Sequence, residues 1–239
     1  MEKLFEIIHE DDDLLVINKP AGLICHPTKG DAYSSLIGRV RLHLGDGKTA
    51  HLANRLDRET SGLVLVAKQD EAVRELRQIW GTREVEKTYL AIVHGHVAAN
   101  SGDVDAPIGK DEQSKSAIKD CVRDDGAPSR TEFWVEKRFS RDGKNISLLR
   151  VMPRTGRKHQ IRIHLAHIGH PIVGDKLYGG DEQIYLDFVQ YRLTSEQKEK
   201  LILENHALHA RKVRFNWRGE TISFHAEPER WFLDFLDAA

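Results

Sequence analysis

Short apolar runs, bounded by turn residues, alternate with polar stretches along the chain. Their length and their content of β-branched side chains favour strands over helices. The runs predict strands at residues 14–18, 63–67, 89–95, 133–139 and 146–153.

Helical periodicity separates these runs. Between residues 69 and 80 the apolar positions recur at intervals of three and four, which is typical of one buried helix face. Thr194 stands three residues before Gln197, a capping-box spacing that predicts a helix start. A last helix is expected over residues 227–239, with Pro228 in its first turn.

The order of these elements predicts the fold class. Strands and helices do not alternate regularly, so we expect an α+β fold with a mixed, largely antiparallel central sheet and flanking helices. The 239 residues suit one domain spanning 1–239. The stretch 101–130, rich in Gly, Asp, Ser and Lys, predicts an exposed loop or flexible hairpin, either a plain surface excursion or a lobe that closes over a ligand.

Cysteine content and hydropathy predict the compartment. Cys25 and Cys121 are too few for a disulfide framework, which fits a reducing environment. The first residues carry no signal-peptide pattern, and no apolar run approaches the roughly 18 residues that a membrane span needs. We expect a cytoplasmic protein with no membrane partner, and a monomer by default.

Charge is balanced overall but uneven along the chain. There are 36 basic and 37 acidic residues, which does not by itself indicate a nucleic-acid partner. Residues 144–173, however, contain no Asp or Glu and hold six cations: Lys144, Arg150, Arg154, Arg157, Lys158 and Arg162. This segment is either a phosphate-binding surface or a solvated charged face.

Histidines cluster at residues 159–170 and raise the question of a metal. His164 and His167 have a helical i, i+3 relation, but zinc sites need three or four convergent ligands. The known zinc-site signatures are missing, so we expect no metal.

Two carboxylates, Asp57 and Glu59, lie in the segment NRLDRETSG before the run LVLVA. On a strand they would share a face, which is one arrangement of a glycosidase carboxylate pair, but this spacing is unspecific. An Asp between arginines is usually a surface ion pair, whereas in a cleft beside Arg its pKa falls and it stays ionised. In RTGRKHQIRIH, Arg162 is a candidate partner for Asp57, and Arg157 and Lys158 are candidates for phosphate contact.

Several motifs, in order, resemble the RluA-type pseudouridine synthases, which convert particular uridines in RNA to their C-glycoside isomer. RLDRETSGLVLVAK resembles the central motif of that family. The other matching segments are DDDLLVINKPAGLICHP, EKTYLAIVHG, DAPIGKD, RTGRKHQIRIHLAHIGHPIVGDKLYG and ALHA, so the resemblance runs from about Glu10 to Arg211.

The resemblance implies roles for individual residues. Asp57 matches the essential carboxylate, Tyr89 the active-site tyrosine and Arg162 the arginine partner. Arg55 matches an arginine that helps fill the space left by a flipped nucleotide. Lys19 in NKPAG and Leu208 in ALHA match positions that border the site.

The family reaction is an isomerisation with no redox step, so the resemblance implies an RNA partner, ribosomal or transfer, and no cofactor. The target base must leave its helix. Tyr89 is then expected to stack on it, and its hydroxyl is a candidate to take the C5 proton. Asp57 either attacks the nucleoside or takes a sugar proton, and the residues do not choose between these routes.

Two departures from the family pattern stand out. Asn54 replaces the His that usually begins the central motif, which bears on the shape of the loop. The optional N-terminal S4 module is expected to be absent. The leading hypothesis is therefore an RNA pseudouridine synthase, and the alternative is an inactive RNA-binding module on the same fold. An unrelated hydrolase is a remote third.

Overall fold

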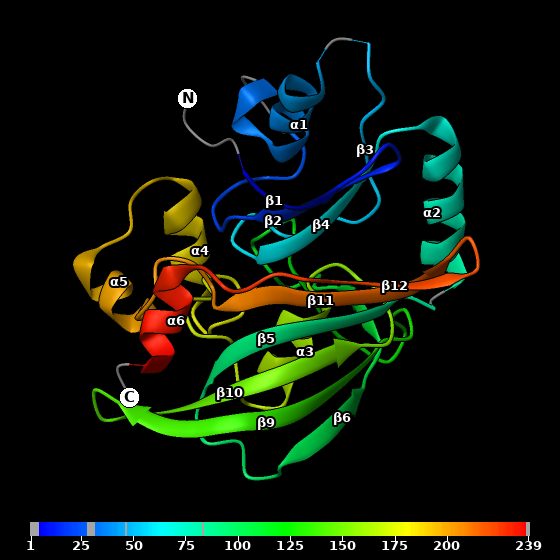
Figure 1. Cartoon of the computed structure of the whole chain (residues 1–239). Coiled ribbons are helices and arrows are strands. Elements are labelled where there is room, and N and C mark those ends of the chain that lie inside the picture. Colours follow the sequence, from blue (N-terminus) through cyan, green and yellow to red (C-terminus); the bar gives the residue numbers. More distant parts are fainter. Residues whose placement is uncertain (1–4, 28–31, 46, 83, 238–239) are drawn as a thin grey trace. The chain divides into compact units, whose positions relative to one another are not determined.

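The computed structural model describes residues 5–27, 32–45, 47–82 and 84–237. The chain divides into two compact units, which Figure 1 colours along the sequence. Unit 1 comprises Met1–Thr88 and His209–Asp234, and unit 2 comprises Tyr89–Leu208 and Phe235–Ala239. The expectation that residues 1–239 form one catalytic domain is not tested by this division and stays a prediction.

Unit 1 is built on a mixed set of strands. These are β1 (Glu6–Glu10), β2 (Leu14–Lys19), β3 (His51–Leu52), β4 (Ser61–Ala67), nearly all of β11 (Leu208–Trp217) and β12 (Glu220–His225). β1, β2, β4 and β11 are hydrogen-bonded in that order, while β3 pairs with β4 and β12 with β11. The pairing of β4 with β11 is parallel and the others are antiparallel.

Helix α2 covers one face of this sheet. Its residues Ala72, Val73 and Leu76 are buried in a cluster with side chains of β2, β4 and β11. The helix spans Asp70–Thr82, close to the prediction from periodicity. The remaining helical elements of the unit are η1 (Ala32–Ser34), α1 (Leu36–Leu44) and most of α6 (Arg230–Asp237).

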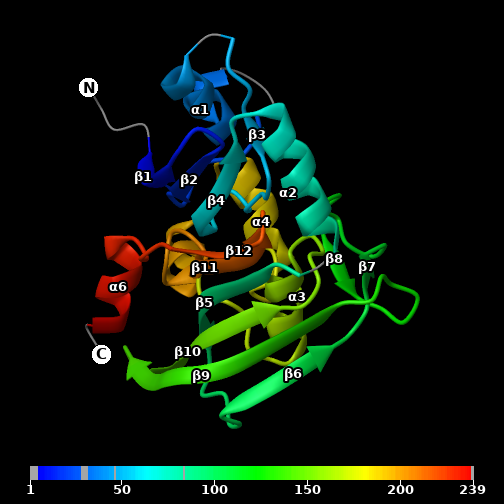
Figure 2. The ribbon, with the colours of Figure 1, turned by 45° about the vertical axis from the view of Figure 1, so that its right-hand side comes forward.

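Unit 2 has an antiparallel sheet with helices on one face. The part of β5 (Glu86–His94) from Tyr89 onward, then β10 (Lys144–Pro153), β9 (Arg130–Arg141) and β6 (Ser101–Asp105), follow one another in the sheet. Helix α3 (Gln160–His167) packs against β9 and β10, as Figure 2 shows. The unit also contains the hairpin of β7 (Ile108–Lys110) and β8 (Asp120–Val122), and the helices α4 (Glu182–Val189) and α5 (Ser195–Leu201).

These elements confirm the predicted α+β class with mostly antiparallel strands and flanking helices. The capping box of Thr194 and Gln197 is confirmed in full. The predicted start of the last helix was wrong, because α6 begins at Arg230, after Pro228. No helix in the described part of the chain is long and apolar enough to cross a membrane.

The stretch 101–130 is more regular than its composition suggested. It contains β6, β7 and β8, and β6 pairs with β9 over Ser101–Asp105. Three of its apolar residues, Val104, Ala106 and Ile108, are buried, whereas Ile118 is exposed. Sparse apolar residues at well-placed positions are thus enough to order a polar segment.

Candidate active site

Asp57 lies in an irregular loop between β3 and β4. Its side chain is half-buried, Arg55 is exposed and Glu59 is buried. Residues 53–60 form no strand, so the geometry that would place Asp57 and Glu59 on one strand face is absent. Asp57 and Glu59 therefore differ in environment, since one is half-buried and the other is buried.

Asn54 ties the start of this loop to β4. Its Nδ2 donates to the carbonyl oxygen of Leu63 at 3.0 Å, and its Oδ1 accepts from the backbone N–H of Leu65 at 2.9 Å. The amide thus acts as a short stretch of strand, matching one donor and one acceptor of the neighbouring backbone. Asn54, a departure from the pattern that the sequence resembles, thus holds the start of the loop against β4.

Cys25 holds the backbone immediately before Asp57. Its thiol donates to the carbonyl oxygen of Leu56 at 3.3 Å, and the Leu56 N–H points back to the sulfur at 3.4 Å. Burial raises the pKa of the Cys25 thiol, which keeps it protonated and able to donate. Residue 56 is therefore fixed through both of its backbone polar groups.

Lys19 holds the backbone immediately after Asp57. Its ammonium donates to the carbonyl oxygens of Pro20 and Leu23, each at 2.9 Å, and of Arg58 at 3.1 Å. The Arg58 carbonyl also accepts from Gly22 N–H at 2.9 Å. With Cys25 on one side and Lys19 on the other, Asp57 is held between two anchored residues.

The environment of Lys19 assigns it a positioning role. Its side chain is completely buried, at 0% exposure, and burial lowers its pKa to about 8, while the negative charges of Glu229 and Asp57 act in the opposite direction. An ammonium enclosed by three carbonyls has no donor to spare. Lys19 therefore holds the Asp57 loop through its three carbonyl partners, and its predicted place beside the substrate stays a prediction.

Ser61 and Gly62 fix the loop where it enters β4. Burial lowers the pKa of His209, whose neutral ring donates from Nε2 to the Ala226 carbonyl and accepts at Nδ1 from the Ser61 hydroxyl, both at 2.9 Å. Gly62 has φ of +110°, and a Cβ there would lie 2.3 Å from the carbonyl oxygen of Ala210 on β11. Gly62 is thus required both by its backbone conformation and by the close approach of β11.

In unit 2, Arg162 is oriented by a residue that sequence reasoning missed. Its Nε lies 2.7 Å from Oδ2 of Asp175, and its Nη2 lies 2.8 Å from Oδ1. Asp175 Oδ1 also accepts from the backbone N–H groups of Leu177 and Tyr178. Burial acts to raise the pKa of Asp175, but the charge and hydrogen bonds of Arg162 outweigh it and hold the pKa below its usual range.

Tyr178 covers the face of the same guanidinium. Arg162 Cζ stands 5.0 Å from the ring centroid, within cation–π range. The Tyr178 hydroxyl accepts from Asp120 N–H at 3.3 Å and lies 2.9 Å from His159 Nδ1. Burial raises the pKa of Tyr178, so the hydroxyl stays protonated and can donate a hydrogen bond to His159 Nδ1. Arg162 is therefore held at one edge and on one face.

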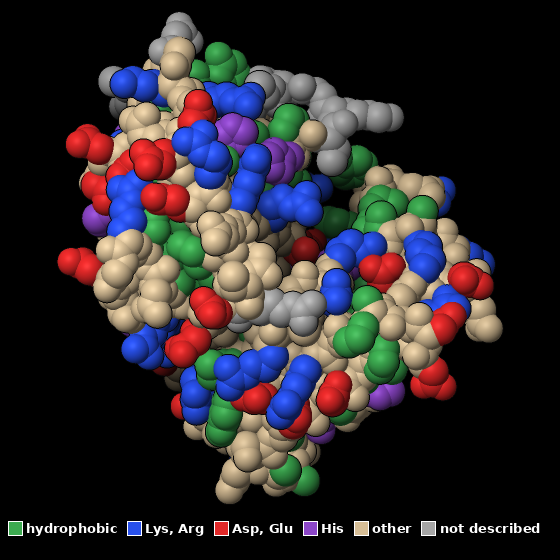
Figure 3. Space-filling view, turned by 90° about the vertical axis from the view of Figure 1, so that its right-hand side faces the viewer, with side chains coloured by type: hydrophobic (Ala, Val, Ile, Leu, Met, Phe, Trp, Pro, Cys, Tyr) green, Lys and Arg blue, Asp and Glu red, His purple; other side chains and the backbone are tan. Residues whose placement is uncertain are grey.

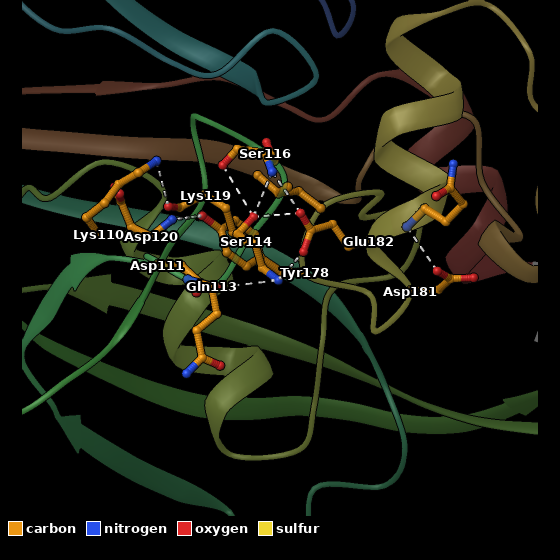
Figure 4. A network of polar contacts seen from close by, with 12 residues as sticks. Lys110, Asp111, Gln113, Ser114, Ser116, Lys119, Asp120, Tyr178, Asp181 and Glu182 are labelled. Carbon is orange, nitrogen blue, oxygen red and sulfur yellow. Dashed lines mark hydrogen bonds and ion pairs between the residues drawn. The ribbon is translucent and has the colours of Figure 1, made fainter.

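The hairpin of β7 and β8 is latched to α4 beside this site (Figure 4). Glu182 Oε1 accepts from the Ser114 hydroxyl at 2.6 Å and from Ser116 N–H at 2.8 Å. Lys119 Nζ lies 3.3 Å from Oε2. Because Asp120 bonds to Tyr178, this latch fixes the hairpin against the group that covers Arg162.

Of the other predicted residues in unit 2, Tyr89 is half-buried on β5 opposite Val151, and Leu208 is buried at the start of β11. Arg157 and Lys158 are exposed just before α3. Lys158 pairs with Asp120 at 2.8 Å, and Arg157 Nε donates to the Pro128 carbonyl at 3.4 Å. Both side chains thus contact the segment 120–128, which precedes β9.

The basic segment 144–173 is largely neutralised by acidic neighbours. Four of its six cations form ion pairs, at 2.6 to 2.8 Å: Arg150 with Glu136, Arg154 with Glu132, Lys158 with Asp120 and Arg162 with Asp175. Acidic and basic side chains are likewise interspersed over the face in Figure 3. The run of cations in the sequence therefore overstates the local positive charge, because the acids come from elsewhere in unit 2.

The clustered histidines hold protein groups. His164 lies between the Thr131 hydroxyl and the Ala106 carbonyl, and His170 bonds to the His94 carbonyl, all at 2.9 Å. Across the described residues, no group of three His, Cys, Asp or Glu side chains is placed to hold a metal ion.

Comparison with known proteins decides the family. The model of the RNA pseudouridylate synthase family matches residues 13–167. The dual-specificity RNA pseudouridine synthase RluA of Vibrio parahaemolyticus is 34% identical over 97% of this chain and 89% of its own length. The chain belongs to the RNA pseudouridylate synthase family. The predicted resemblance to RluA-type pseudouridine synthases is thus confirmed.

Other members of this family differ in length. The ribosomal large subunit pseudouridine synthase D of Haemophilus ducreyi is 33% identical over 97% of this chain and 70% of its own. An uncharacterized RNA pseudouridine synthase of Aquifex aeolicus is 38% identical over 72% of this chain, which spans only 55% of that relative. The solved structure of human RNA pseudouridylate synthase domain containing 1 superposes with a TM-score of 0.77 at 25% identity, covering 100% of this chain and 89% of that one.

The predicted site residues of this family member, catalytic and substrate-binding, are divided between its two units. Unit 1 carries Lys19, Arg55 and Asp57, and unit 2 carries Tyr89 and Arg162. In unit 1, hydrogen bonds from Lys19 and Cys25 hold the backbone on either side of Asp57. In unit 2, Asp175 holds the edge of the Arg162 guanidinium and Tyr178 covers its face.

Proposed function

We propose that this protein isomerises specific uridines in RNA to pseudouridine, with Asp57 as the essential carboxylate. The anchoring of the Asp57 loop carries the proposal: residue 56 is bonded to Cys25 and residue 58 to Lys19. A carboxylate held this steadily can meet a substrate atom repeatedly in one orientation, which is what positional catalysis requires. A surface aspartate in a mobile loop lacks that property.

The chemistry needs one carboxylate and no external reactant. The bond from C1′ to N1 breaks, the base turns, C1′ joins C5, the C5 proton leaves and N1 takes up a proton. An ionised Asp57 either attacks the nucleoside or removes a proton from the sugar, and in both routes it is regenerated. Arg162, fixed by Asp175, is proposed to pair with Asp57 and keep it ionised.

Tyr89 and Arg55 are proposed to handle the extruded base. Extrusion costs a few kcal/mol, less in an RNA loop, and stacking of the base on Tyr89 offsets roughly 1 to 3 kcal/mol of this. The exposed Arg55 is proposed to occupy the vacated space in the RNA. Leu208 would border the base, and Arg157 and Lys158 would contact phosphate.

Ribosomal or transfer RNA is the proposed substrate. The name of the Haemophilus relative refers to the ribosomal large subunit, which supports ribosomal RNA. We place the reaction in the cytoplasm, because Cys25 and Cys121 are free thiols and Cys25 needs its thiol to hold Leu56. The basic residues left for the RNA backbone are fewer than the sequence alone suggested.

Tritium release from RNA labelled at uridine C5 tests the proposal, because isomerisation removes that hydrogen. Wild-type protein is expected to release tritium from ribosomal or transfer RNA transcripts, and Asp57→Asn to release none while its Kd for RNA stays within about threefold of wild type. Lys48→Gln, a change on an exposed side chain outside the proposed site, serves as control. Binding without release by the wild-type protein would favour the inactive RNA-binding module.

A further inference from the structure

The corner between α4 and α5 displays an aromatic ring in a strained position. α4 ends with two bonds typical of a Schellman motif: Arg192 N–H to the Asp187 carbonyl at 2.8 Å, and Tyr191 N–H to the Phe188 carbonyl at 3.0 Å. Tyr191 takes the left-handed position of this motif, with φ of +57°, where glycine is the usual residue. Its side chain is 92% exposed.

The corner itself is rigidly built. Asp187 accepts hydrogen bonds from Gln183 at 2.9 Å and from Gln197 at 2.7 Å, and Arg192 lies 3.9 Å from its Oδ1. Gln197 in turn closes the capping box with Thr194, so the end of α4 is tied to the start of α5. The backbone that carries the ring is therefore fixed before any ligand binds.

Two exposed side chains at this corner could meet a nucleotide, the Tyr191 ring and the Arg192 guanidinium. Val189, at 48% exposure, is the other large exposed hydrophobic residue of this corner in the described structure. The adjacent Arg192 side chain is 63% exposed and positively charged. A protein interface needs a broader contiguous contact area, whereas one ring beside a cation is enough to stack a base and meet its phosphate.

We propose that Tyr191 stacks on an unpaired base of the substrate RNA outside the target nucleotide, with Arg192 at the adjoining phosphate. The inference rests on the proposed function for the identity of the RNA. It adds a recognition residue on unit 2 that makes affinity depend on an unpaired nucleotide in the substrate.

Tyr191→Gly separates the two contributions. The change removes the ring and places the favoured residue in the left-handed position, so the thermal midpoint should stay equal or rise. The Kd for the RNA transcript that wild type isomerises should increase by about 5- to 100-fold, since stacking is worth roughly 1 to 3 kcal/mol per base. Tyr191→Phe keeps the ring and should bind within about twofold of wild type, as should the neighbouring control Val189→Ala.

Three outcomes decide the matter. Crosslinking of Tyr191 to transcripts carrying 5-iodouridine, located by mass spectrometry, would support stacking. If Tyr191→Gly binds RNA like wild type, or loses a protein partner while its RNA affinity is unchanged, the inference is overturned. In either case, tritium release by the wild-type protein tests the proposed function independently. An enzyme that is active but whose RNA affinity does not depend on Tyr191 would contradict only this inference.

Discussion

Arg162 and Asp175 form a two-point ion pair inside unit 2, with Nε 2.7 Å from Oδ2 and Nη2 2.8 Å from Oδ1. Both side chains are buried. The pair sets the plane of the guanidinium, and Tyr178 covers one face of it. The orientation of the proposed catalytic arginine thus depends on an aspartate outside the predicted set.

Asp175→Ala is expected to destabilise the protein by about 3 to 5 kcal/mol, because it leaves the Arg162 charge buried and uncompensated. Urea unfolding measures this. Asp175→Asn preserves the shape and should also lower the rate of tritium release at saturating RNA. Lys158→Ala, which breaks an exposed pair with Asp120, should change stability by less than about 1 kcal/mol. Equal losses in the two alanine variants would contradict the role given to the buried pair.

Lys19→Met should remove a pH-dependent part of the stability. The folded-state pKa of about 8 lies below the ordinary 10.5, so between these values the unfolded chain binds one more proton. The unfolding free energy of wild type should therefore rise relative to that of Lys19→Met from pH 8 to 10.5, by up to about 3 kcal/mol. Urea titrations at pH 7, 9 and 10 provide the comparison. A difference that does not vary with pH would show that Lys19 titrates normally.

Gly62→Ala should be more disruptive than the same change at another glycine with positive φ. Its Cβ would meet the Ala210 backbone, so strain and overpacking together predict a loss of roughly 2 to 5 kcal/mol. Gly219, with φ of +86° and open space around it, gives the control, where roughly 1 to 2 kcal/mol is expected. Thermal unfolding of both variants separates the two effects, and similar losses would argue against a tight β4–β11 contact.

Asn54→Ala should loosen the start of the Asp57 loop. It leaves the Leu63 carbonyl and the Leu65 N–H without their amide partner, a loss of roughly 1 to 3 kcal/mol. The rate of tritium release should fall more than the affinity for RNA, because the loop carries Asp57. Asn54→His restores one donor and one acceptor, so its unfolding free energy and its rate of tritium release should lie between those of wild type and Asn54→Ala. Unchanged unfolding of the alanine variant would rule out this anchoring.

Much of the secondary structure could be predicted from the sequence because its signals are local. The apolar run at residues 63–67 became the buried strand β4, and the spacing of Ala72, Val73 and Leu76 gave α2. Thr194 and Gln197 formed the capping box that their separation implied. The family followed from the order of the motifs. These features depend on residues within a few positions of each other, or on the linear order itself.

The partners of the functional side chains were decided by tertiary structure alone. Lys19 read as a residue bordering the substrate, yet it is enclosed by three carbonyls of two loops. Arg162 was predicted as the partner of Asp57 and counted in a basic run, yet Asp175 forms a two-point ion pair with it, and other acids of unit 2 pair with three more cations of that run. A hydrogen bond or ion pair depends on which distant backbone and side-chain groups the fold brings within about 3 Å. No periodicity along the chain encodes that proximity. The sequence alone therefore predicted the candidate site residues, and only the tertiary structure showed which groups hold them in place.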